Sequence, residues 1–275
     1  MEVVNEEQKK FDEKLSEIVE KIRLTSRFMV VATNQMGKTD VSMHLFRAIM
    51  KRSDHAENKV KTIDFDPAVN LRYKFDKVPF IDRTKVRHVP LAQDLIVDIP
   101  FINASLKRDA IMEVLSSDFI HKRKLKMEHN GNNPFYNFYI IDEMQNIWGT
   151  YALRKKDGES ALTIFSESSN YGMVIIGLSQ RFADVATGVV ERCAYYLVGR
   201  LSGDNELKKL QRMVDNEKII SQVRGLKRGE FVFIDKDNPE YSVEIDFNEF
   251  KQVGTPYELT ETKPVGVDGI VREIF

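Results

Sequence analysis

Apolar residues at helical spacing mark the first segment of the chain. In "EEQKKFDEKLSEIVEKIRL", the residues Phe11, Leu15, Ile18, Val19 and Ile22 recur on one side of a helical projection, and charged residues occupy the other side. This period is typical of an amphipathic helix that rests one face on a core. We therefore expect an N-terminal amphipathic helix within residues 1–25.

Short apolar runs alternate with helical patterns through the rest of the chain. Helices are expected from Lys38 to Met50 and from Asp109 to Lys126. Because strands that alternate with helices build parallel sheets covered on both faces, we predict an α/β fold with a mainly parallel central sheet flanked by helices. The expected strands are Phe28 to Ala32, "KVKTIDFDPA", "TKVRHVPL", "FYNFYIIDE", "GMVIIGLSQ", "AYYLVGRL", and a closing pair formed by "GEFVFID" and "YSVEID".

No internal repeat and no linker rich in Pro, Gly or Ser divides the 275 residues. A chain of this length can bury one large α/β core. We expect one main domain over residues 26–250, preceded by the N-terminal helix and followed by a tail, residues 251–275, of weak periodicity.

The segment "ATNQMGKT" follows an apolar strand and precedes a helical pattern. Ala32, Gly37, Lys38 and Thr39 fit the phosphate-binding loop pattern, with Ala in place of the usual first Gly. In such a loop the backbone N–H groups surround phosphates, the lysine reaches the β and γ phosphates, and the threonine hydroxyl ligates Mg²⁺. An ordinary turn with a solvated lysine is the alternative. The expected nucleotide-binding residues are Ala32, Asn34, Gln35, Met36, Gly37, Lys38, Thr39 and Asp40.

Three further polar residues follow two buried strands. In "FYIIDEMQN", Asp142 is placed to hold Mg²⁺ and Glu143 to polarise an attacking water, although an acidic pair here is also typical of a helix start. Gln180 ends "GMVIIGLSQ" and is expected beside the γ phosphate, because ligands gather at the carboxyl ends of parallel strands. A polar cap at the end of the strand is the alternative for Gln180.

The composition limits which kinds of binding site the chain can contain. The 41 Lys and Arg residues nearly balance the 42 Asp and Glu residues, so any nucleic-acid contact must come from local basic loops. A single cysteine, Cys193, excludes an internal disulfide and a Cys-rich zinc site, and the five histidines show no metal-ligand spacing. The absence of a long apolar run and the charged N-terminus indicate no membrane span and a cytoplasmic protein.

The order of these motifs resembles the HerA/FtsK group of ATP-driven DNA translocases, which includes conjugative coupling proteins and viral genome-packaging ATPases. The resemblance extends over roughly residues 28–235 through "ATNQMGKT", "IIDEMQN", "SSNYGMVIIGLSQRFADV", "ERCAYYLVGRL" and "LKRGEFVFID". It implies a RecA-like P-loop NTPase that assembles into a hexameric ring with ATP sites between subunits. Phe182 departs from the pattern, because a proline commonly follows the Gln-Arg pair.

This resemblance implies a function and further residues. The chain is expected to be an ATP-hydrolysing, Mg²⁺-dependent motor that moves double-stranded DNA, for genome packaging or DNA transfer, with a capsid or transfer-apparatus partner in the cytoplasm or host cytoplasm. The loop after the Asp-Glu strand would face the ring channel, which makes Arg154, Lys155 and Lys156 candidate DNA contacts or else a solvated surface. Arg200 and Arg181 are candidates for an arginine supplied to the neighbouring subunit.

Two other functions remain open at this stage. A RecA-like helicase or recombinase would share the first two motifs. A nucleotide-gated assembly protein with a slow ATPase would share the nucleotide site but not the response to DNA. The cluster "HKRKLK", residues 121–126, is a second basic feature and is interpreted as the cationic end of a helix.

Overall fold

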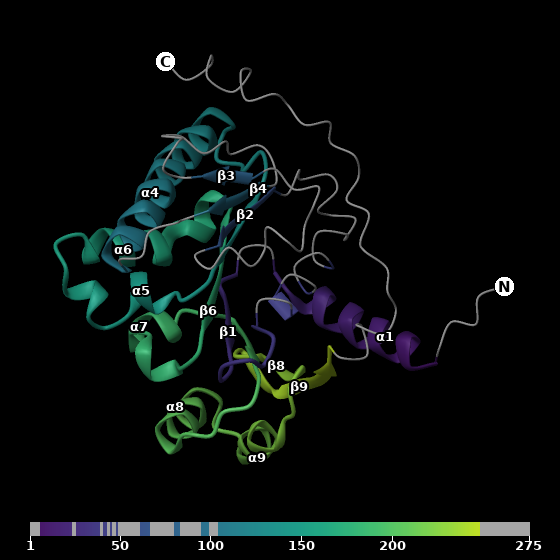
Figure 1. Cartoon of the computed structure of the whole chain (residues 1–275). Coiled ribbons are helices and arrows are strands. Elements are labelled where there is room, and N and C mark those ends of the chain that lie inside the picture. Colours follow the sequence, from purple (N-terminus) through teal and green to yellow (C-terminus); the bar gives the residue numbers. More distant parts are fainter. Residues whose placement is uncertain are drawn as a thin grey trace.

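The computed structural model describes residues 6–23, 26–38, 61–66, 80–82, 95–98 and 104–247, together with residues 41, 42, 45 and 48. Nine strands lie in this described part, and they form one sheet (Figure 1). The strands are β1 (Phe28–Val31), β2 (Lys61–Asp66), β3 (Phe80–Asp82), β4 (Leu95–Asp98), β5 (Asn137–Ile141), β6 (Met173–Ser179), β7 (Tyr195–Val198), β8 (Glu230–Asp235) and β9 (Asn238–Asp246). Their order across the sheet is β3-β4-β2-β5-β6-β1-β7-β8-β9.

The sheet is parallel over most of its width. Every neighbouring pair from β3 to β7 runs in parallel. β8 then pairs with β7, and β9 with β8, in antiparallel register. The predicted α/β fold with a mainly parallel central sheet flanked by helices is therefore confirmed, as is the closing pair of strands.

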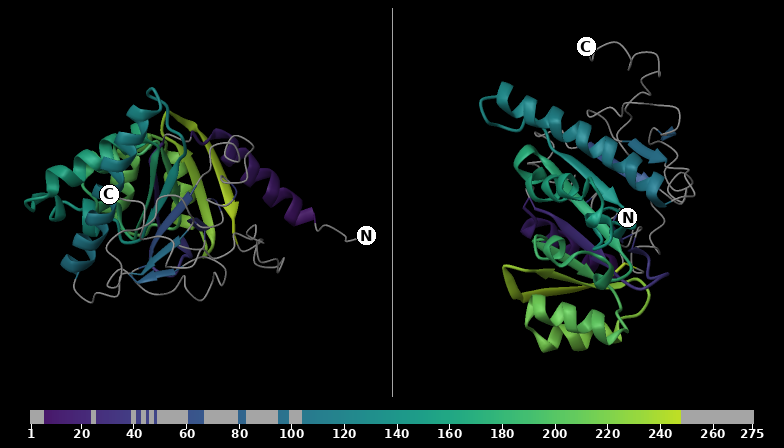
Figure 2. Two further views of the ribbon diagram at one scale, coloured as in Figure 1. Left: turned by 90° about the horizontal axis from the view of Figure 1, so that it is seen from above. Right: turned by 90° about the vertical axis from the view of Figure 1, so that its left-hand side faces the viewer.

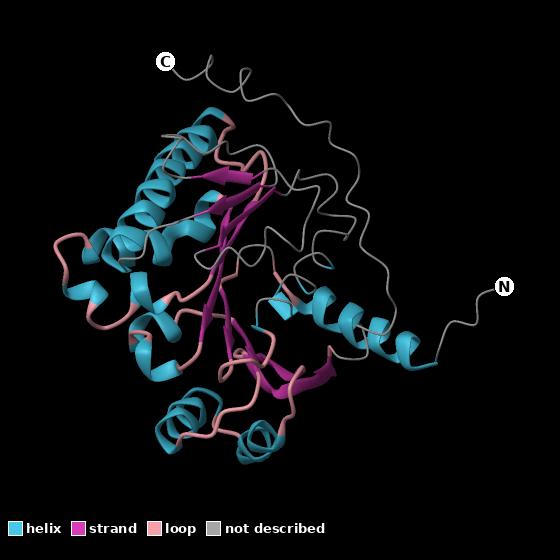
Figure 3. Cartoon of the chain, viewed as in Figure 1, coloured by secondary structure: helices cyan, strands magenta, loops and turns pink. Residues whose placement is uncertain are grey.

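Helices cover both faces of the sheet. Figures 1 and 2 show α4 to α7 on one face and α1 on the opposite face, and Figure 3 separates the layers by colour. The α-helices are α1 (Glu6–Lys21), α4 (Ala104–Glu128), α5 (Gln145–Trp148), α6 (Gly158–Glu167), α7 (Thr187–Val190), α8 (Asp204–Val214) and α9 (Glu217–Gly225). Short 3-10 helices are η1 (Ala152–Arg154), η2 (Ser168–Tyr171) and η3 (Phe182–Asp184).

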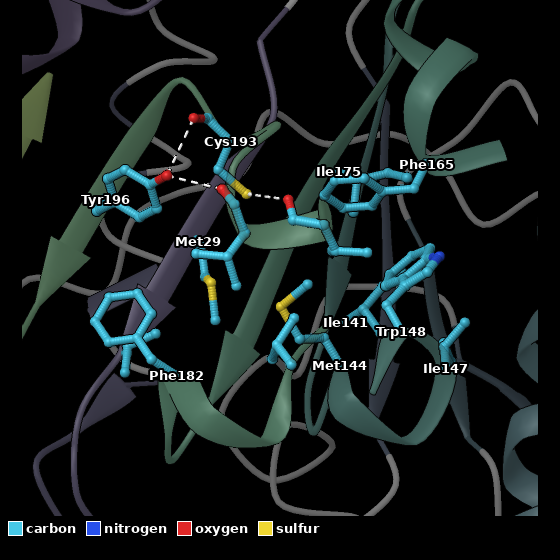
Figure 4. Packing of buried hydrophobic residues seen from close by; sticks show 14 of the residues in the cluster. Met29, Ile141, Met144, Ile147, Trp148, Phe165, Ile175, Phe182, Cys193 and Tyr196 are labelled. Atoms are coloured by element: carbon cyan, nitrogen blue, oxygen red, sulfur yellow. Dashed lines mark hydrogen bonds between the residues drawn. The ribbon is translucent and has the colours of Figure 1, made fainter. Parts of the chain in front are cut away.

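Alternate residues of each central strand enter two separate cores. On β1, Met29 and Val31 join the core under α4 to α9, whereas Phe28 and Val30 join the core that contains α1. Successive side chains of a strand point to opposite faces, so a strand covered on both faces is apolar throughout. Figure 4 shows part of the first core, where Trp148 packs against Phe165, with 4.9 Å between ring centres, and the ring of Phe182 lies 6.1 Å from that of Tyr196.

The predicted N-terminal helix is present as α1. Leu15, Ile18, Val19 and Ile22 are buried in the second core, and the backbone oxygen of Lys21 accepts a hydrogen bond of 2.8 Å from the Tyr195 hydroxyl. The apolar stripe in the sequence therefore identified the buried face correctly. The side chain of Phe11 lies outside the described residues.

The long helix α4 includes the predicted segment Asp109 to Lys126 and extends it at both ends. Its buried Asp118 accepts a 3.0 Å hydrogen bond from the Tyr139 hydroxyl on β5, and burial raises the pKa of Asp118 to about 7. Lys122 is only 1% exposed and donates to the backbone oxygen of Phe135, and burial lowers its pKa to about 7. The most buried lysine of "HKRKLK" thus attaches α4 to the segment that precedes β5, in agreement with a structural role for that cluster.

Some predicted features fall outside the described residues. They are the strand "TKVRHVPL", parts of the helix from Lys38 to Met50, and the tail from residue 251 onward. Within the described part of the chain, each helix is too short or too polar to cross a bilayer.

Candidate nucleotide-binding site

Four adjacent strands bring the predicted site residues to one edge of the sheet. β5, β6, β1 and β7 are neighbours and run in parallel. Each of these strands is followed within two residues by a predicted site residue, in the same order: Asp142, Gln180, Ala32 and Arg200. Ligands of open α/β folds bind beyond the carboxyl ends of such strands, so the topology gathers residues from distant parts of the chain at a suitable place.

The loop from Ala32 to Gly37 connects β1 to the helical residue Lys38. Gln35 and Gly37 have positive φ angles of 64° and 89°, and the backbone N–H of Val41 donates 3.0 Å to the oxygen of Gly37 as the helix begins. Glycine adopts this φ region without a steric penalty, which explains the residue type at position 37. The loop therefore has the strand–loop–helix geometry that a phosphate-binding motif requires.

Neighbouring segments hold both ends of this loop. The backbone N–H of Ala32 donates to the oxygen of Ser179 at 3.4 Å, and that of Thr33 donates to the oxygen of Arg200 at 3.2 Å. At the other end, the N–H of Gly229 donates to the oxygen of Met36 at 3.2 Å. The "RGEF" turn, which carried part of the sequence resemblance, is therefore in contact with the phosphate loop.

Side chains of the loop differ in what they can offer a nucleotide. Asn34 and Gln35 are exposed, whereas Met36 is 2% exposed and packs in the second core. Any contact of Met36 with a nucleotide must therefore come from its backbone. The Thr33 hydroxyl oxygen is buried without a hydrogen-bond partner among the described residues, and Thr33 lines a pocket of about 590 Å³. The sequence reasoning did not single out Thr33.

Ala32 occupies the usual position of the first glycine because a glycine lies opposite it. A Cβ added to Gly199, which follows β7, would lie 2.7 Å from the Ala32 Cβ and 2.9 Å from the ring of Phe231. Real Cβ atoms do not approach a neighbour so closely, so one of the two positions must lack a side chain. The space between positions 32 and 199 therefore holds one Cβ atom, which belongs to Ala32, and position 199 is glycine.

We expect Gly199→Ala to lower the free energy of unfolding by about 1–3 kcal/mol through overpacking. Ala32→Gly should then cost less in the Gly199→Ala protein than in the wild type, because it removes one of the two close contacts. Urea denaturation of the double-mutant cycle measures this coupling. Gly225→Ala is the control, since an added Cβ there meets nothing within 4 Å. Strictly additive effects at positions 32 and 199 would contradict the shared-space explanation.

Lys38 lies between the loop and the acidic pair. Its ammonium group donates to the backbone oxygens of Ala32 at 3.1 Å and of Thr33 at 3.4 Å. Burial lowers the pKa of Lys38, and the negative charges of Asp142 and Glu143 partly oppose that decrease. The lysine and both carboxylates therefore act on one another electrostatically, as the predicted roles require.

Two amide side chains hold the carboxylate of Glu143. Gln180 donates to Glu143 Oε1 at 2.7 Å, and Gln145 donates to Glu143 Oε2. The backbone of Glu143 has a positive φ of 54°, which is rare for a residue with a side chain, and its N–H donates 2.9 Å to Asp142 Oδ1. Unusual backbone geometry of this kind is concentrated at functional sites.

Gln145 is a second residue that the sequence reasoning did not assign. The Ser179 hydroxyl donates to Gln145 Oε1 at 3.0 Å, so the amide of Gln145 must present its N–H side to Glu143. Its position three residues after Asp142, within "IIDEMQN", was the available signal. Ser179, Gln145, Glu143 and Gln180 form a continuous network across the ends of β5 and β6.

The two candidate arginines lie in different surroundings. Arg181 contacts Glu206 at 3.4 Å and Asp184 at 4.0 Å within its own subunit. The side chain of Arg200 is exposed and forms no ion pair with another described residue. Of the two, Arg200 is the one without an ion-pair partner among the described residues, although the side chain of Arg181 is also 57% exposed.

The predicted basic loop lies on the surface between α5 and α6. Arg154, Lys155 and Lys156 are exposed, and the guanidinium of Arg154 lies 5.6 Å from the ring centre of Tyr151, which is 83% exposed. Lys155 donates to the Ser105 hydroxyl at 3.0 Å. An exposed aromatic ring thus lies beside exposed basic side chains on this loop.

The base of this loop is fixed in the protein. Arg108, 2% exposed, forms a 2.6 Å ion pair with Asp157 and lowers the pKa of that carboxyl group. Trp148 donates from its indole N–H to the oxygen of Ala161 at 2.8 Å. The oxygen of Trp148 accepts the N–H of Ala186 at 2.9 Å, and Gly149 forms an antiparallel bridge with Val185. The basic loop is thereby connected to the segment that follows Gln180.

Thr39 and Asp40 lie outside the described residues, so the predicted contribution of Thr39 to metal binding stays a prediction. The structure brings together Lys38, Asp142, Glu143 and Gln180 at the end of the sheet. Arg154, Lys155 and Lys156 lie on a separate loop.

Comparison with solved structures supports this fold. The genome packaging NTPase B204 from Sulfolobus turreted icosahedral virus 2, solved with sulfate, is similar with a TM-score of 0.61 and 16% identity, over 82% of this chain and 97% of that chain. VirB4 of Thermoanaerobacter pseudethanolicus is similar with a TM-score of 0.57 and 11% identity, over 83% and 91%. The predicted resemblance to HerA/FtsK-type ATPases is thus confirmed at the level of the fold.

The pCW3 conjugation coupling protein TcpA is also similar, with a TM-score of 0.52 and 14% identity, over 82% of this chain and 61% of that chain. B204 has been solved with AMP, AMPPCP and ATP-gammaS as well as with sulfate. The sequence matches no protein-family model, and comparison with curated protein sequences finds no match.

Proposed function

We propose that this chain is the ATPase subunit of a ring that moves double-stranded DNA, in genome packaging or DNA transfer. The observation that carries the proposal is the network in which Gln180 and Gln145 hold Glu143 near Lys38, at the end of a phosphate-binding loop. Similarity of fold to a genome packaging NTPase and a conjugation coupling protein supports the choice of DNA as the cargo.

The nucleotide would lie against the loop from Ala32 to Gly37. Backbone N–H groups of this loop and the start of the following helix would surround the phosphates, and Lys38 would leave the carbonyl oxygens of Ala32 and Thr33 to contact the β and γ phosphates. The buried hydroxyl of Thr33, which has no hydrogen-bond partner in the described part of the chain, fits a ligand in this place.

A magnesium ion would be held by Asp142 and Thr39. Hard oxygen ligands suit Mg²⁺, which usually binds through one or two carboxylate or hydroxyl groups together with substrate phosphates. Among the described residues, no cluster of His, Cys, Asp or Glu could hold a metal by itself, which fits an ion that arrives with the nucleotide. When bound, Mg²⁺ supplies neutralising charge at the phosphate oxygens.

Glu143 would orient and polarise the attacking water. Its two amide partners fix the direction of the carboxylate, since both donate hydrogen bonds to it. Gln180 would exchange its bond to Glu143 for one to the γ phosphate and so report the nucleotide state. The segment after Gln180 then contacts the base of the basic loop through Val185 and Ala186.

Arg154, Lys155 and Lys156 would contact the DNA backbone. Contacts from a few cations per subunit, repeated around a hexameric ring, bind DNA without sequence preference and weaken with salt. A capsid or transfer-apparatus partner would dock the ring at the site where DNA moves.

The test compares phosphate release by the full chain in Mg²⁺ and ATP with and without double-stranded DNA. We expect DNA to stimulate hydrolysis and Lys38→Ala to abolish it. Unchanged turnover in Lys38→Ala would refute the site. ATP hydrolysis without any response to DNA would favour a nucleotide-gated assembly protein, and unwinding of DNA without movement along duplex DNA would favour a helicase.

The same assay tests the basic loop. Alanine at Arg154, Lys155 and Lys156 should weaken DNA binding, reduce the salt slope by about 1 for each phosphate that is no longer neutralised, and leave hydrolysis without DNA intact. Alanine at the exposed residues Arg212, Lys218 and Arg224 of α8 and α9 removes equal charge and is the control. Equal salt slopes for both triple variants would show that the loop does not contact DNA.

A further inference from the structure

A buried carboxylate on α8 holds the segment that follows Gln180. Glu206 is 5% exposed, and its Oε2 accepts the backbone N–H groups of Phe182 at 2.5 Å and Ala183 at 3.2 Å. Its Oε1 accepts Arg181 Nε at 3.4 Å. A buried charged group is costly unless it is paired and hydrogen-bonded, so these three donors explain why a carboxylate is tolerated here.

A second residue of α8, one turn after Glu206, binds the backbone carbonyl groups of the same segment. Lys209 donates to the backbone oxygens of Phe182 at 2.7 Å and Val185 at 2.9 Å. Phe182 itself is fully buried and its ring lies 6.1 Å from that of Tyr196 in the first core. Residues 181–185, called here the relay segment, are thus attached to α8 through both their N–H groups and their carbonyl groups.

Residue 182 is a position at which the residue type matters. The sequence departs here from the family pattern, in which proline is common. A proline has no backbone N–H and could not make the 2.5 Å bond to Glu206. The phenylalanine therefore permits a contact with α8 that the usual residue would exclude.

The two ends of this connection lie at different functional positions. The relay segment begins directly after Gln180, which contacts Glu143 in the nucleotide site. α8 begins at Asp204, directly after the segment 200–203 that contains Arg200. Ser202 and Gly203 of that segment line the same 590 Å³ pocket as Gln180 and Glu206.

We propose that Glu206 is a positioning residue that makes the relay segment and α8 move together, so that the nucleotide state sensed at Gln180 sets the position of the segment carrying Arg200. The inference rests on the proposed ATPase function. Each subunit would present Arg200 to its neighbour according to whether its own site holds the γ phosphate. Hydrolysis at successive sites would then be coupled through the contact between Glu206 and the relay segment.

Hydrogen exchange of the full chain with ATPγS or ADP bound tests this proposal. In the wild type, we expect the two nucleotides to give different protection both at residues 32–38 and at the amides of residues 201–214. In Glu206→Ala, the difference at 32–38 should persist and that at 201–214 should fall by at least half. Glu206→Gln should restore most of it, because one amide oxygen can still accept the backbone N–H groups of Phe182 and Ala183.

The control is Glu217→Ala, which removes an exposed acid from the first turn of α9. If Glu206→Ala does not fold, Lys209→Met removes the second half of the attachment and is expected to give the same loss at 201–214. A full nucleotide-dependent difference at 201–214 in Glu206→Ala, or in Lys209→Met where the first variant fails to fold, would overturn the proposal. Failure of the proposed ATPase function would look different, because wild-type residues 32–38 would then show no protection by either nucleotide.

Discussion

Glu143→Gln is expected to yield a protein that binds ATP and Mg²⁺ but hydrolyses ATP about 10²–10⁴ times more slowly, the range typical for loss of a general base. Glutamine has the size of glutamate, so the strained backbone at φ 54° and the surrounding packing are preserved. In the proposed site, Asp142 would still hold the metal and Lys38 would still contact the phosphates. The loss therefore falls on the chemical step and not on binding.

The hydrogen-bond network predicts a specific rearrangement in this variant. As long as the Ser179 hydroxyl donates to Gln145 and not to the nearby backbone oxygen of Arg181, Gln145 keeps its amide orientation and the new side-chain oxygen at position 143 accepts from it. Gln180 must then turn its amide oxygen toward the new NH₂ group. The NH₂ group of Gln180 is then directed away from residue 143 and can donate to the γ phosphate. The proposed change at Gln180 on ATP binding can therefore still occur in a variant that does not hydrolyse ATP.

A nucleotide-retention assay measures the result. Radiolabelled ATP should remain unhydrolysed on Glu143→Gln after wild type has converted it to ADP, and the dissociation constant for ATP should change little. Glu159→Gln, in the exposed first turn of α6, is the matched control. Normal cycling of Glu143→Gln would show that Glu143 only shapes the turn after β5.

Arg200→Ala is expected to lower turnover about 10³–10⁵-fold if Arg200 completes the neighbouring site, which is the effect typical of an arginine finger. In the proposed site, charge would build on the γ-phosphoryl oxygens in the transition state, and Lys38 is the cation that the described part of the phosphate-binding loop places there. The exposed Arg200 has no ion-pair partner among the described residues, whereas Arg181 is paired with Glu206.

Mixing variants separates action between subunits from action within one. Arg200→Ala and Lys38→Ala proteins should each be inactive, but a mixture should recover turnover where an intact Lys38 site meets an intact Arg200. Arg200→Ala mixed with a chain carrying both substitutions should stay inactive, because no subunit then supplies the arginine. Arg212→Ala controls for the loss of an exposed cation. Full activity of Arg200→Ala alone in an assembled ring would exclude Arg200 and leave Arg181 to be tested.

Several features of the site follow from local sequence. A few consecutive residues are enough to encode each of three segments: the strand from Phe28, the loop to Gly37 and the strand before Asp142. Parallel strands all end at the same edge of a sheet, so local patterns sufficed to predict that Ala32, Asp142 and Gln180 would lie near one another. Their chemical roles stay predictions that the variants above can test.

Contacts between side chains of distant segments could not be predicted in this way. Gln145 and Glu206 are ordinary polar residues near the starts of helices, and an acid there is usually explained by the helix dipole alone. Lys122 belongs to a basic cluster but is 1% exposed. Hydropathy describes a residue type, whereas burial and hydrogen bonding depend on which segments pack beside it.

The sequence alone determined the strands next to the site, the apolar faces and the phosphate-binding motif, because these depend on local backbone preferences and on the period of apolar residues. It did not predict β3, β4, α8 or α9. Only the tertiary structure decided that Gly199 makes room for Ala32, that two amides hold Glu143, and that Glu206 joins α8 to the relay segment. Each of these depends on the close approach of atoms from segments far apart in the chain. Close packing sets such distances to within tenths of an ångström, and the pattern of apolar and polar residues along the chain does not predict them.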